Sequence, residues 1–365
     1  MKTIESGRIS GYQLVGLLFM IRLVPRTLLC PTPLIGAPVR DMWLADLLSG
    51  VLAVCFVLAV TDLGNRNPGK TTIEYARLHL GWFAGKLVGL FLTLYFVIVA
   101  ATTARNLAES FSISIMPRTP IVVFIVLLLF LAASIARNGL EAVARTGEIL
   151  FPLILLLMFA LILLPADLMR FERLRPVLTR GWSPVVALTS VEFSFYLEFI
   201  IIGMIFPHVN RPTEGTRLAL FTVVFTSVLL AIMCVAMIAI FGPTTDAISL
   251  QAFQLARVIQ LGEFFERIEA LVLAAWVLAT GVKLAILTWA SALSLSQFME
   301  LKTYRPVVYP VAALTAVLSI SLFEDVVVMS RFVAIHWTQF VIPSLLLMVV
   351  ALLVATFFRG GETTP

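Results

Sequence analysis

Long, uniformly apolar runs constrain this chain more than any other feature. The runs over 121–133 and 150–164 are apolar on every helical face, so a helix made from either has no side that suits water. Hydrophobic residues make up 60% of the chain, which is more than one soluble core of this length can bury. The solvent around these segments is therefore lipid, and the sequence predicts an integral membrane protein.

The spacing of the apolar runs predicts an all-α architecture. A hydrocarbon core of ~30 Å needs roughly 20 residues per helix, and we expect about ten such transmembrane helices in one polytopic domain, 1–365. A transmembrane barrel would instead show alternating segments of roughly 10 residues. The expected helices are 11–35 with an interruption, 43–61, 82–104, 119–136, 148–166, 184–206, 217–241, 267–298, 306–323 and 332–358.

The first and sixth expected helices carry unusual residues at membrane depth. In the first, Pro25 removes a backbone donor, which predicts local unwinding. In the sixth, Glu192 and Glu198 lie among apolar residues, and we expect an interruption near Ser194. Unwound backbone in a membrane is tolerated only where protein or a wet cavity satisfies it. Both interruptions therefore point to a site inside the protein.

The positions of these two helices indicate a repeat. They hold corresponding places in two halves of five helices, the pseudo-repeats 11–166 and 184–358. Interrupted helices at corresponding places are typical of transporters built from inverted repeats. The halves share no visible residue-level similarity, so this prediction depends on helix order alone.

Ionisable residues inside a membrane need a partner or a wet cavity, because each costs ~2.5–3.5 kcal/mol on insertion scales. Lys283 lies in the middle of its helix, far from any other charge along the chain. Glu198 is the expected counter-charge, and the pair can act as a structural lock, a proton relay or part of a carboxylate-binding feature. Arg22 and Arg26 either face the interior or extend outward to the headgroups.

Two further groups of charges lie near helix ends. Arg105 and Glu109 are four residues apart and share a helix face, which favours a structural ion pair over a gate. Glu266, Arg267 and Glu269 open the eighth expected helix. We interpret them as a network at the helix end rather than as ligand contacts.

Catalytic and metal-binding patterns are missing from the sequence. Cys30, Cys55 and Cys234 are scattered, and no phosphate loop, dinucleotide fingerprint or metalloprotease motif occurs. We therefore expect that the chain has no catalytic residues, binds no metal or cofactor, and is not an enzyme. The net charge of +5 is explained by helix orientation and anionic lipid, so nucleic acid is not an expected partner.

Short strings spread along nearly the whole chain form one ordered pattern. The strings are Ile9-Ser10 with Gln13, Asp41-Met42-Trp43, Pro68-Gly69-Lys70-Thr71 with Glu74-Tyr75, Gly81 with Gly85-Lys86, Arg105 with Glu109, Arg118-Thr119-Pro120-Ile121, Gly139-Leu140-Glu141 with Ala144-Arg145, Leu174-Arg175-Pro176-Val177-Leu178, Phe206-Pro207, and Phe265-Glu266-Arg267-Ile268-Glu269 with Trp276. In this order the chain resembles the spore germination permeases, the B subunits of nutrient germinant receptors, in the amino acid–polyamine–organocation transporter superfamily.

The resemblance implies a fold like that of the leucine transporter, with five-plus-five inverted topology and a central pocket where helices one and six break. It also implies residence in the inner membrane of a dormant spore, in a complex with an A subunit and a lipoprotein C subunit. Germinant amino acids or sugars would be sensed there. Family members commonly have a Gly-x-Gly-like stretch at the first break, where this chain has Val24-Pro25-Arg26.

These observations together predict a ligand site and its function. We hypothesise a ligand carboxylate held by backbone amides of both breaks and by Arg26, whose fork suits bidentate recognition. Phe195 and Tyr196 would close over its apolar part. The expected ligand-binding residues are Val24, Pro25, Arg26, Ser194, Phe195, Tyr196, Glu198 and Lys283. A germinant receptor subunit is the leading interpretation; a secondary amino-acid permease and a scaffold with a vestigial pocket are the alternatives.

Overall fold

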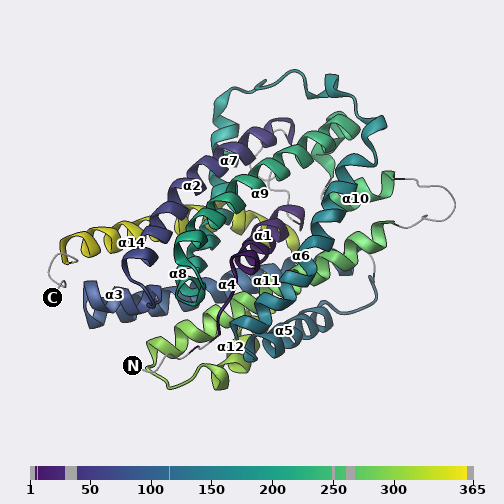
Figure 1. Ribbon diagram of the computed structural model, residues 1–365. Coiled ribbons are helices and arrows are strands. Elements are labelled where there is room, and N and C mark those ends of the chain that lie inside the picture. Colours follow the sequence, from purple (N-terminus) through teal and green to yellow (C-terminus); the bar gives the residue numbers. More distant parts are fainter. Residues whose placement is uncertain are drawn as a thin grey trace.

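The computed structural model is helical throughout the part of the chain that it describes (Figure 1). The described residues are 5, 7–28, 39–114, 116–248, 251–259 and 268–359. Within these ranges no strand occurs, and one isolated bridge joins Ile9 to Val209. The all-α fold class predicted from the apolar runs is thus observed.

The helices follow the apolar runs of the sequence closely, because each run has enough residues to satisfy its own backbone as a helix. The α-helices are α1 (Gly11–Leu28), α2 (Met42–Arg66), α3 (Thr72–Leu80), α4 (Trp82–Ser114), α5 (Ile121–Arg137), α6 (Leu140–Leu163), α7 (Trp182–Tyr196), α8 (Ile202–Ile205), α9 (Pro212–Phe241), α10 (Gln251–Val258), α11 (Ile268–Phe298), α12 (Val308–Ser321), α13 (Val326–Arg331) and α14 (Thr338–Arg359).

Seven segments of the described chain are long and apolar enough to cross a membrane. They are Val39–Arg66, Trp82–Ser112, Leu140–Leu168, Trp182–His208, Pro212–Thr245, Glu269–Phe298 and Val327–Phe358. Three apolar helices are shorter, namely Gly11–Val24, Ile121–Arg137 and Arg305–Ser321. These segments indicate an integral membrane protein, while the count of ten spans stays a prediction.

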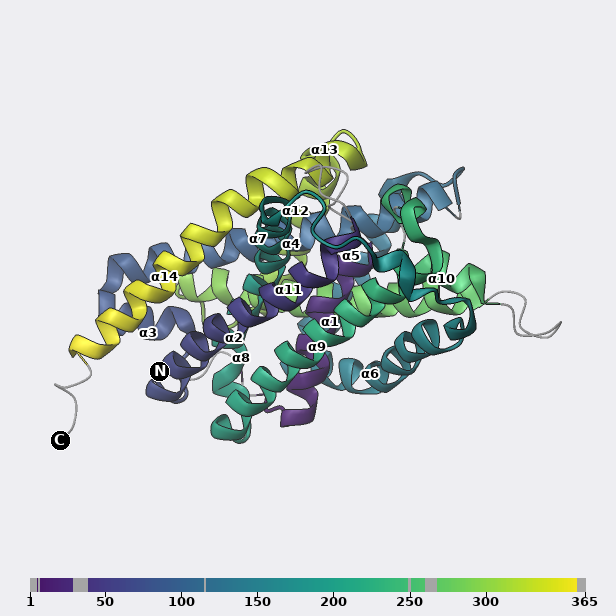
Figure 2. The ribbon, with the colours of Figure 1, turned by 90° about the horizontal axis from the view of Figure 1, so that it is seen from above.

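Helix α1 lies in the centre of the bundle in both views (Figures 1 and 2). It packs against α6, α9 and α11, and its residues from Leu14 to Val24 are buried. Around it, α2 packs between α7 and α9, and α4 packs on α11. Arg22 of α1 is consequently held inside protein and away from lipid.

The interruption predicted near Pro25 is wrong for the described residues. Helix α1 continues through Pro25 and ends at Leu28, while residues 29–38 lie outside the description. A proline removes a single intrahelical hydrogen bond, here the one to the carbonyl of Ile21. The close packing of the helix up to Val24 holds the backbone helical despite that loss.

The sixth expected helix does change form, one turn after Ser194. Helix α7 ends at Tyr196, a 3-10 segment covers Leu197–Ile201, and α8 follows. The chain is therefore tightened here, not unwound. A stretch of 3-10 helix inside a longer helix often marks a hinge or local strain. Every residue of Leu197–Ile201 is buried, so protein surrounds the change of helix type.

The last long helix contains a second irregularity, which the sequence did not predict. Between α13 and α14, Phe332–Trp337 forms a π-helix. π-Helical turns are rare in proteins, and a large share of those that occur lie at functional sites. The π-helix packs against α7, and α14 packs against both α7 and the 3-10 segment Leu197–Ile201.

Candidate functional site

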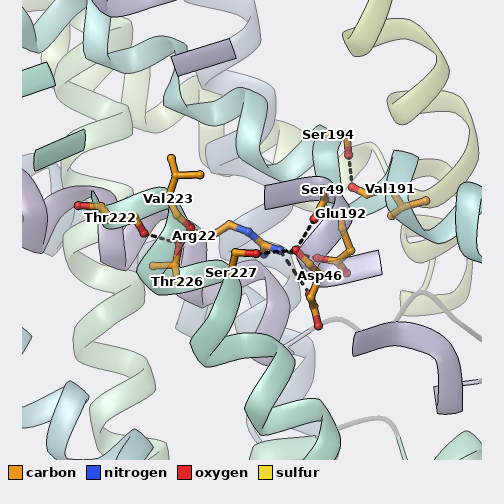
Figure 3. A network of polar contacts seen from close by, with 10 residues as sticks. All are labelled: Arg22, Asp46, Ser49, Val191, Glu192, Ser194, Thr222, Val223, Thr226 and Ser227. Atoms are coloured by element: carbon orange, nitrogen blue, oxygen red, sulfur yellow. Dashed lines mark hydrogen bonds and ion pairs between the residues drawn. The ribbon is translucent and has the colours of Figure 1, made fainter. Parts of the chain in front are cut away.

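A buried arginine joins three helices in the core (Figure 3). Arg22 of α1 places Nη2 2.6 Å from Oε2 of Glu192 on α7 and 3.7 Å from Oδ1 of Asp46 on α2. All three side chains are fully buried. Of the two orientations left open for Arg22, the structure shows the inward one. We call Arg22, Asp46 and Glu192 the buried triad.

Neighbouring helices add hydrogen bonds and ring contacts to the triad. The hydroxyl of Ser227 on α9 donates to the backbone oxygen of Asp46 at 2.8 Å (Figure 3). Gly50 permits this approach of α2 to α9, because a Cβ there would lie 2.2 Å from Oγ of Ser227. The ring of Tyr196 lies under the Arg22 guanidinium, 4.3 Å from Cζ to the ring centroid. Tyr196 thus contacts Arg22.

A second buried ion pair joins the 3-10 segment to α11. Nζ of Lys283 lies 2.7 Å from Oε2 of Glu198, and the two side chains are 0% and 5% exposed. The pairing expected from the sequence is present. The ion pair joins the irregular part of helix six to the long helix α11.

A small cavity adjoins Glu198. Its volume is about 30 Å³. We call the end of α7 together with the 3-10 segment Leu197–Ile201 the helix-six break. The lining residues come from α1, α4, the helix-six break, and α13 with the π-helix; among them are Val24, Thr102, Asn106, Phe195, Glu198 and Trp337. Ligand pockets for small molecules are typically ~300–1,000 Å³, whereas one water needs only ~10–15 Å³. The cavity in this structure is therefore large enough for water but not for an amino acid.

The two irregular helices meet at this cavity. The hydroxyl of Thr338 lies 3.2 Å from that of Ser194 and donates to the carbonyl of Val333, 3.0 Å away, across the wide turn. Trp337, at the end of the π-helix, stacks on Tyr95 of α4 with ring centroids 5.6 Å apart. The Ser194–Thr338 contact thus joins the end of α7 to the helix that carries Trp337.

Arg105 and Glu109 of α4 form an ion pair beside the C-terminal end of α12. Nη2 of Arg105 lies 2.6 Å from Oε1 of Glu109, and both side chains are largely buried. The guanidinium also donates to the carbonyls of Ser319, Ile320 and Glu324. An arginine at a helix C-terminus satisfies carbonyls that lack partners there. The pair therefore joins α4 to the end of α12, and its structural role stays a prediction.

The structure places the other expected site residues as follows. Val24, Phe195 and Glu198 line the cavity, Ser194 lies beside it, and Lys283 lies behind Glu198. The side chains of Pro25 and Arg26 lie outside the described part of the chain, as do Glu266 and Arg267. Glu269 is half-buried at the start of α11.

The sequence reasoning missed Asp46 and the pairing of Arg22 with Glu192. Asp46 lies in the second apolar run, and a charge at that depth needs an opposite charge. Its position was therefore a signal in the sequence that a buried cation such as Arg22 lies nearby. The sequence reasoning also missed Trp337. In the described residues no cluster of His, Cys, Asp and Glu is arranged to hold a metal ion.

Glu5 ties the N-terminal segment to the end of the bundle. Its carboxylate accepts from the backbone N–H groups of Gly7 and Leu140, from Nε1 of Trp289 at 3.1 Å and from the hydroxyl of Tyr304 at 2.9 Å. Burial alone would raise the pKa of Glu5, but these four donors together hold it below the ordinary value. The ionised carboxylate is therefore stabilised in the folded protein.

Acid is expected to release this segment. Because the pKa of Glu5 is lowered on folding, its contribution is present above the ordinary carboxyl range and is lost as pH falls through the lowered value. Because pepsin itself needs acid, its cleavage near the N-terminus of the purified protein is compared at each pH with that of Glu5→Gln, and the ratio should change steeply as Glu5 is protonated. Glu5→Gln should remove that step and expose the segment at higher pH. An unchanged cleavage profile in Glu5→Gln would contradict this assignment.

Solved structures show that the fold is that of transporters. The chain aligns with the nucleobase-cation-symport-1 family transporter Mhp1, in a closed conformation with bromovinylhydantoin bound, at a TM-score of 0.69 and 13% identity, covering 96% of this chain and 80% of that one. It aligns with MhsT in complex with L-phenylalanine at a TM-score of 0.69 and 13% identity, covering 96% and 89%. At these identities the likeness concerns the fold alone.

Sequence relatives identify the family. Spore germination protein KB of Bacillus subtilis (strain 168) is 24% identical over 325 residues, 87% of this chain and 86% of that protein. Spore germination protein YndE of the same organism is 26% identical over 271 residues, 72% of this chain and 73% of that protein. The model of the spore germination protein family matches residues 8–328, nearly the whole chain. This transporter-like membrane protein therefore belongs to the spore germination protein family.

Proposed function

We propose that this protein is the membrane subunit of a spore nutrient germinant receptor, which binds a small, amino acid-like germinant and triggers germination. The observation that carries the proposal is the cavity at the helix-six break, lined by Glu198 and closed by the residues of the π-helix. Family membership supplies the biological setting. The role is recognition rather than catalysis.

The complete receptor would place this chain in the inner membrane of the spore with A and C subunits. We propose ten membrane spans, the seven long segments and the three shorter apolar helices, arranged as five-plus-five inverted repeats. The support is the alignment with transporters over nearly the whole chain. The hypothesis that Arg26 binds a ligand carboxylate stays part of this proposal.

Ligand binding would act by shifting a conformational equilibrium. A cavity of about 30 Å³ cannot hold an amino acid, so a ligand must bind a more open form of the protein. A ligand that binds only the open form moves the population toward it. The hydrogen bond between Ser194 and Thr338 and the Glu198–Lys283 ion pair each involve a residue that lines the cavity or is next in sequence to one. Their rearrangement would transmit opening to helix six, α11 and α14.

Filling the cavity tests the proposal. In Thr102→Phe a ring should occupy the cavity, so spores carrying this variant should no longer germinate in a mixture of common amino acids. Overpacking costs ~1–3 kcal/mol, so protein levels in spore membranes must be measured as well. Ser110→Phe is the matched control, because Ser110 is also a half-buried hydroxyl on α4 but does not line the cavity. Normal germination of Thr102→Phe spores would argue against a ligand site here.

A secondary permease is the second candidate, favoured by the solved structures. The aligned proteins include a Na⁺-coupled sialic acid symporter, at a TM-score of 0.69 and 12% identity. Uptake of radiolabelled amino acids into proteoliposomes separates the two functions. Binding without uptake supports a receptor, and concentrative uptake that depends on an ion gradient supports a permease.

A further inference from the structure

A groove between the ends of two long helices has an apolar wall and a charged one. Its volume is about 270 Å³, and its lining residues are Asp62, Arg66, Leu353, Val354, Phe357 and Phe358. The two charged residues belong to α2, and the four apolar residues belong to α14, which packs on α2. We propose that this groove binds a phospholipid with a phosphoethanolamine headgroup, with the phosphate at Arg66 and the ammonium at Asp62.

The groove lies at the border between the hydrocarbon and the headgroups of the membrane. The segments Val39–Arg66 and Val327–Phe358 are both long and apolar enough to cross a membrane, and the groove joins their C-terminal ends. Both segments therefore end at the same membrane surface. The side chains of Phe357 and Phe358 are each 73% exposed, and such apolar area is stable against lipid tails rather than against water. The apolar wall thus faces hydrocarbon, and the ion pair marks the start of the polar layer.

Asp62 and Arg66 offer both charges to one ligand. Nε of Arg66 lies 2.7 Å from Oδ2 of Asp62, and the side chains of Arg66 and Asp62 are 51% and 46% exposed. This contact uses one of the five N–H groups of the guanidinium and one of the two carboxylate oxygens. A phosphate can therefore bind the Nη groups while an ammonium binds Oδ1. Close to hydrocarbon, water screens these contacts less than at an ordinary protein surface.

The ion pair is neutral as a whole, and this neutrality selects the headgroup. A headgroup with a phosphate and no cation would place its negative charge beside the carboxylate of Asp62 as well as beside Arg66. A choline headgroup carries a positive charge, but its quaternary nitrogen has no N–H group to donate. Phosphoethanolamine supplies an anion for Arg66 and N–H donors for Asp62. The groove therefore fits this headgroup better than the other two.

An apolar helix of another membrane protein is the competing occupant. Such a helix would cover the rings of Phe357 and Phe358, but it would also bury the Asp62–Arg66 pair without giving either charge a new partner. Taking charges out of water is costly unless further hydrogen bonds compensate for the loss of hydration. A lipid headgroup supplies those hydrogen bonds, and its tails cover the rings. Charge complementarity therefore favours a lipid in the groove.

Binding of defined lipids to the purified full chain tests the inference. The delipidated protein in detergent is titrated with phosphatidylethanolamine, phosphatidylcholine and phosphatidylglycerol that carry the same acyl chains, and native mass spectrometry counts the bound lipids. We expect phosphatidylethanolamine to bind about 10-fold more tightly than either of the others, which is the effect of one charge-assisted hydrogen bond. Equal affinities for the three lipids would overturn the inference.

Water-soluble phosphoethanolamine separates a lipid site from a site for free phosphate compounds. It carries the same charged groups but lacks the tails that cover the apolar wall, so it should not bind measurably. Binding of phosphoethanolamine as tight as that of the whole lipid would show a site for a soluble ligand and would contradict the proposal.

Variants assign the headgroup preference to the ion pair. Asp62→Asn should bind the three lipids with similar affinity, and Arg66→Gln should weaken the binding of all three about 10-fold. Both side chains are about half-exposed, so the fold should tolerate either change. Glu141→Gln is the matched control, because Glu141 also pairs with an arginine four residues later, is 45% exposed and does not line the groove. A preference retained in Asp62→Asn, or lost in Glu141→Gln, would overturn the assignment.

Filling the groove separates it from the general lipid coat of the protein. Val354→Trp puts a large ring into the apolar wall, so the preference for phosphatidylethanolamine should disappear. Val350→Trp is the control one turn earlier on α14, because Val350 is similarly exposed, 53% against 49%, but does not line the groove. If Val354→Trp kept the full preference, the lipid would bind elsewhere. A photoreactive residue in place of Phe357 checks the competing occupant in native membranes, and labelling of another membrane protein instead of lipid would refute the proposal.

Discussion

Arg22→Met is expected to destabilise the protein by ~3–5 kcal/mol, as when one partner of a buried ion pair is removed. Arg22 is fully buried and faces two carboxylates from different helices, Glu192 at 2.6 Å and Asp46 at 3.7 Å. Without the guanidinium, the carboxylates of Asp46 and Glu192 stay buried in the core and lose the cation that they both face, which destabilises the folded state. Thermal unfolding of the purified protein in detergent, followed by tryptophan fluorescence, measures the loss.

A surface ion pair provides the control for that measurement. Arg145 pairs with Glu141 one turn away on α6, and their side chains are 67% and 45% exposed. Arg145→Met should cost at most ~1 kcal/mol, since water and salt screen such pairs. If both arginine variants unfolded at the same temperature, the buried triad would have no special role in stability.

Lys283→Met is expected to have a comparably large effect, ~3–5 kcal/mol, because it leaves Glu198 in the core without its cation. The double variant Glu198→Gln, Lys283→Met should be more stable than Lys283→Met, since it removes the charge that would otherwise be unpaired. The same unfolding experiment compares wild type, both single variants and the double variant. A double-mutant cycle gives the coupling energy of the two residues.

Additive effects would contradict the pairing. If the double variant lost as much stability as the sum of the single variants, Glu198 and Lys283 would act independently despite their proximity. The expected coupling also ties stability to function, because Glu198 faces the cavity as well as Lys283. Variants at either position must therefore be compared in both unfolding and binding.

Several features of the protein follow from local sequence. Apolar runs with no polar face require lipid, and a helix is the form in which such a run satisfies its own backbone. The isolated charge of Lys283 predicted an opposite charge at similar depth, and Lys283 is paired with Glu198 in the structure. Thr71 and Glu74 form a capping box that starts α3, a signal contained within four residues. The short strings, taken in their order along the chain, indicated the family to which the protein belongs.

Other features depend on how the helices pack. Arg22, Asp46 and Glu192 belong to three different helices. Which charges meet depends on helix rotation and tilt, which periodicity does not specify. Pro25 indicated a break, yet α1 continues through it because buried neighbours hold the helix. The π-helix at Phe332–Trp337 has no signal of its own in the sequence. It exists where α14 meets the helix-six break, so only the tertiary structure decided where the cavity lies and what closes it.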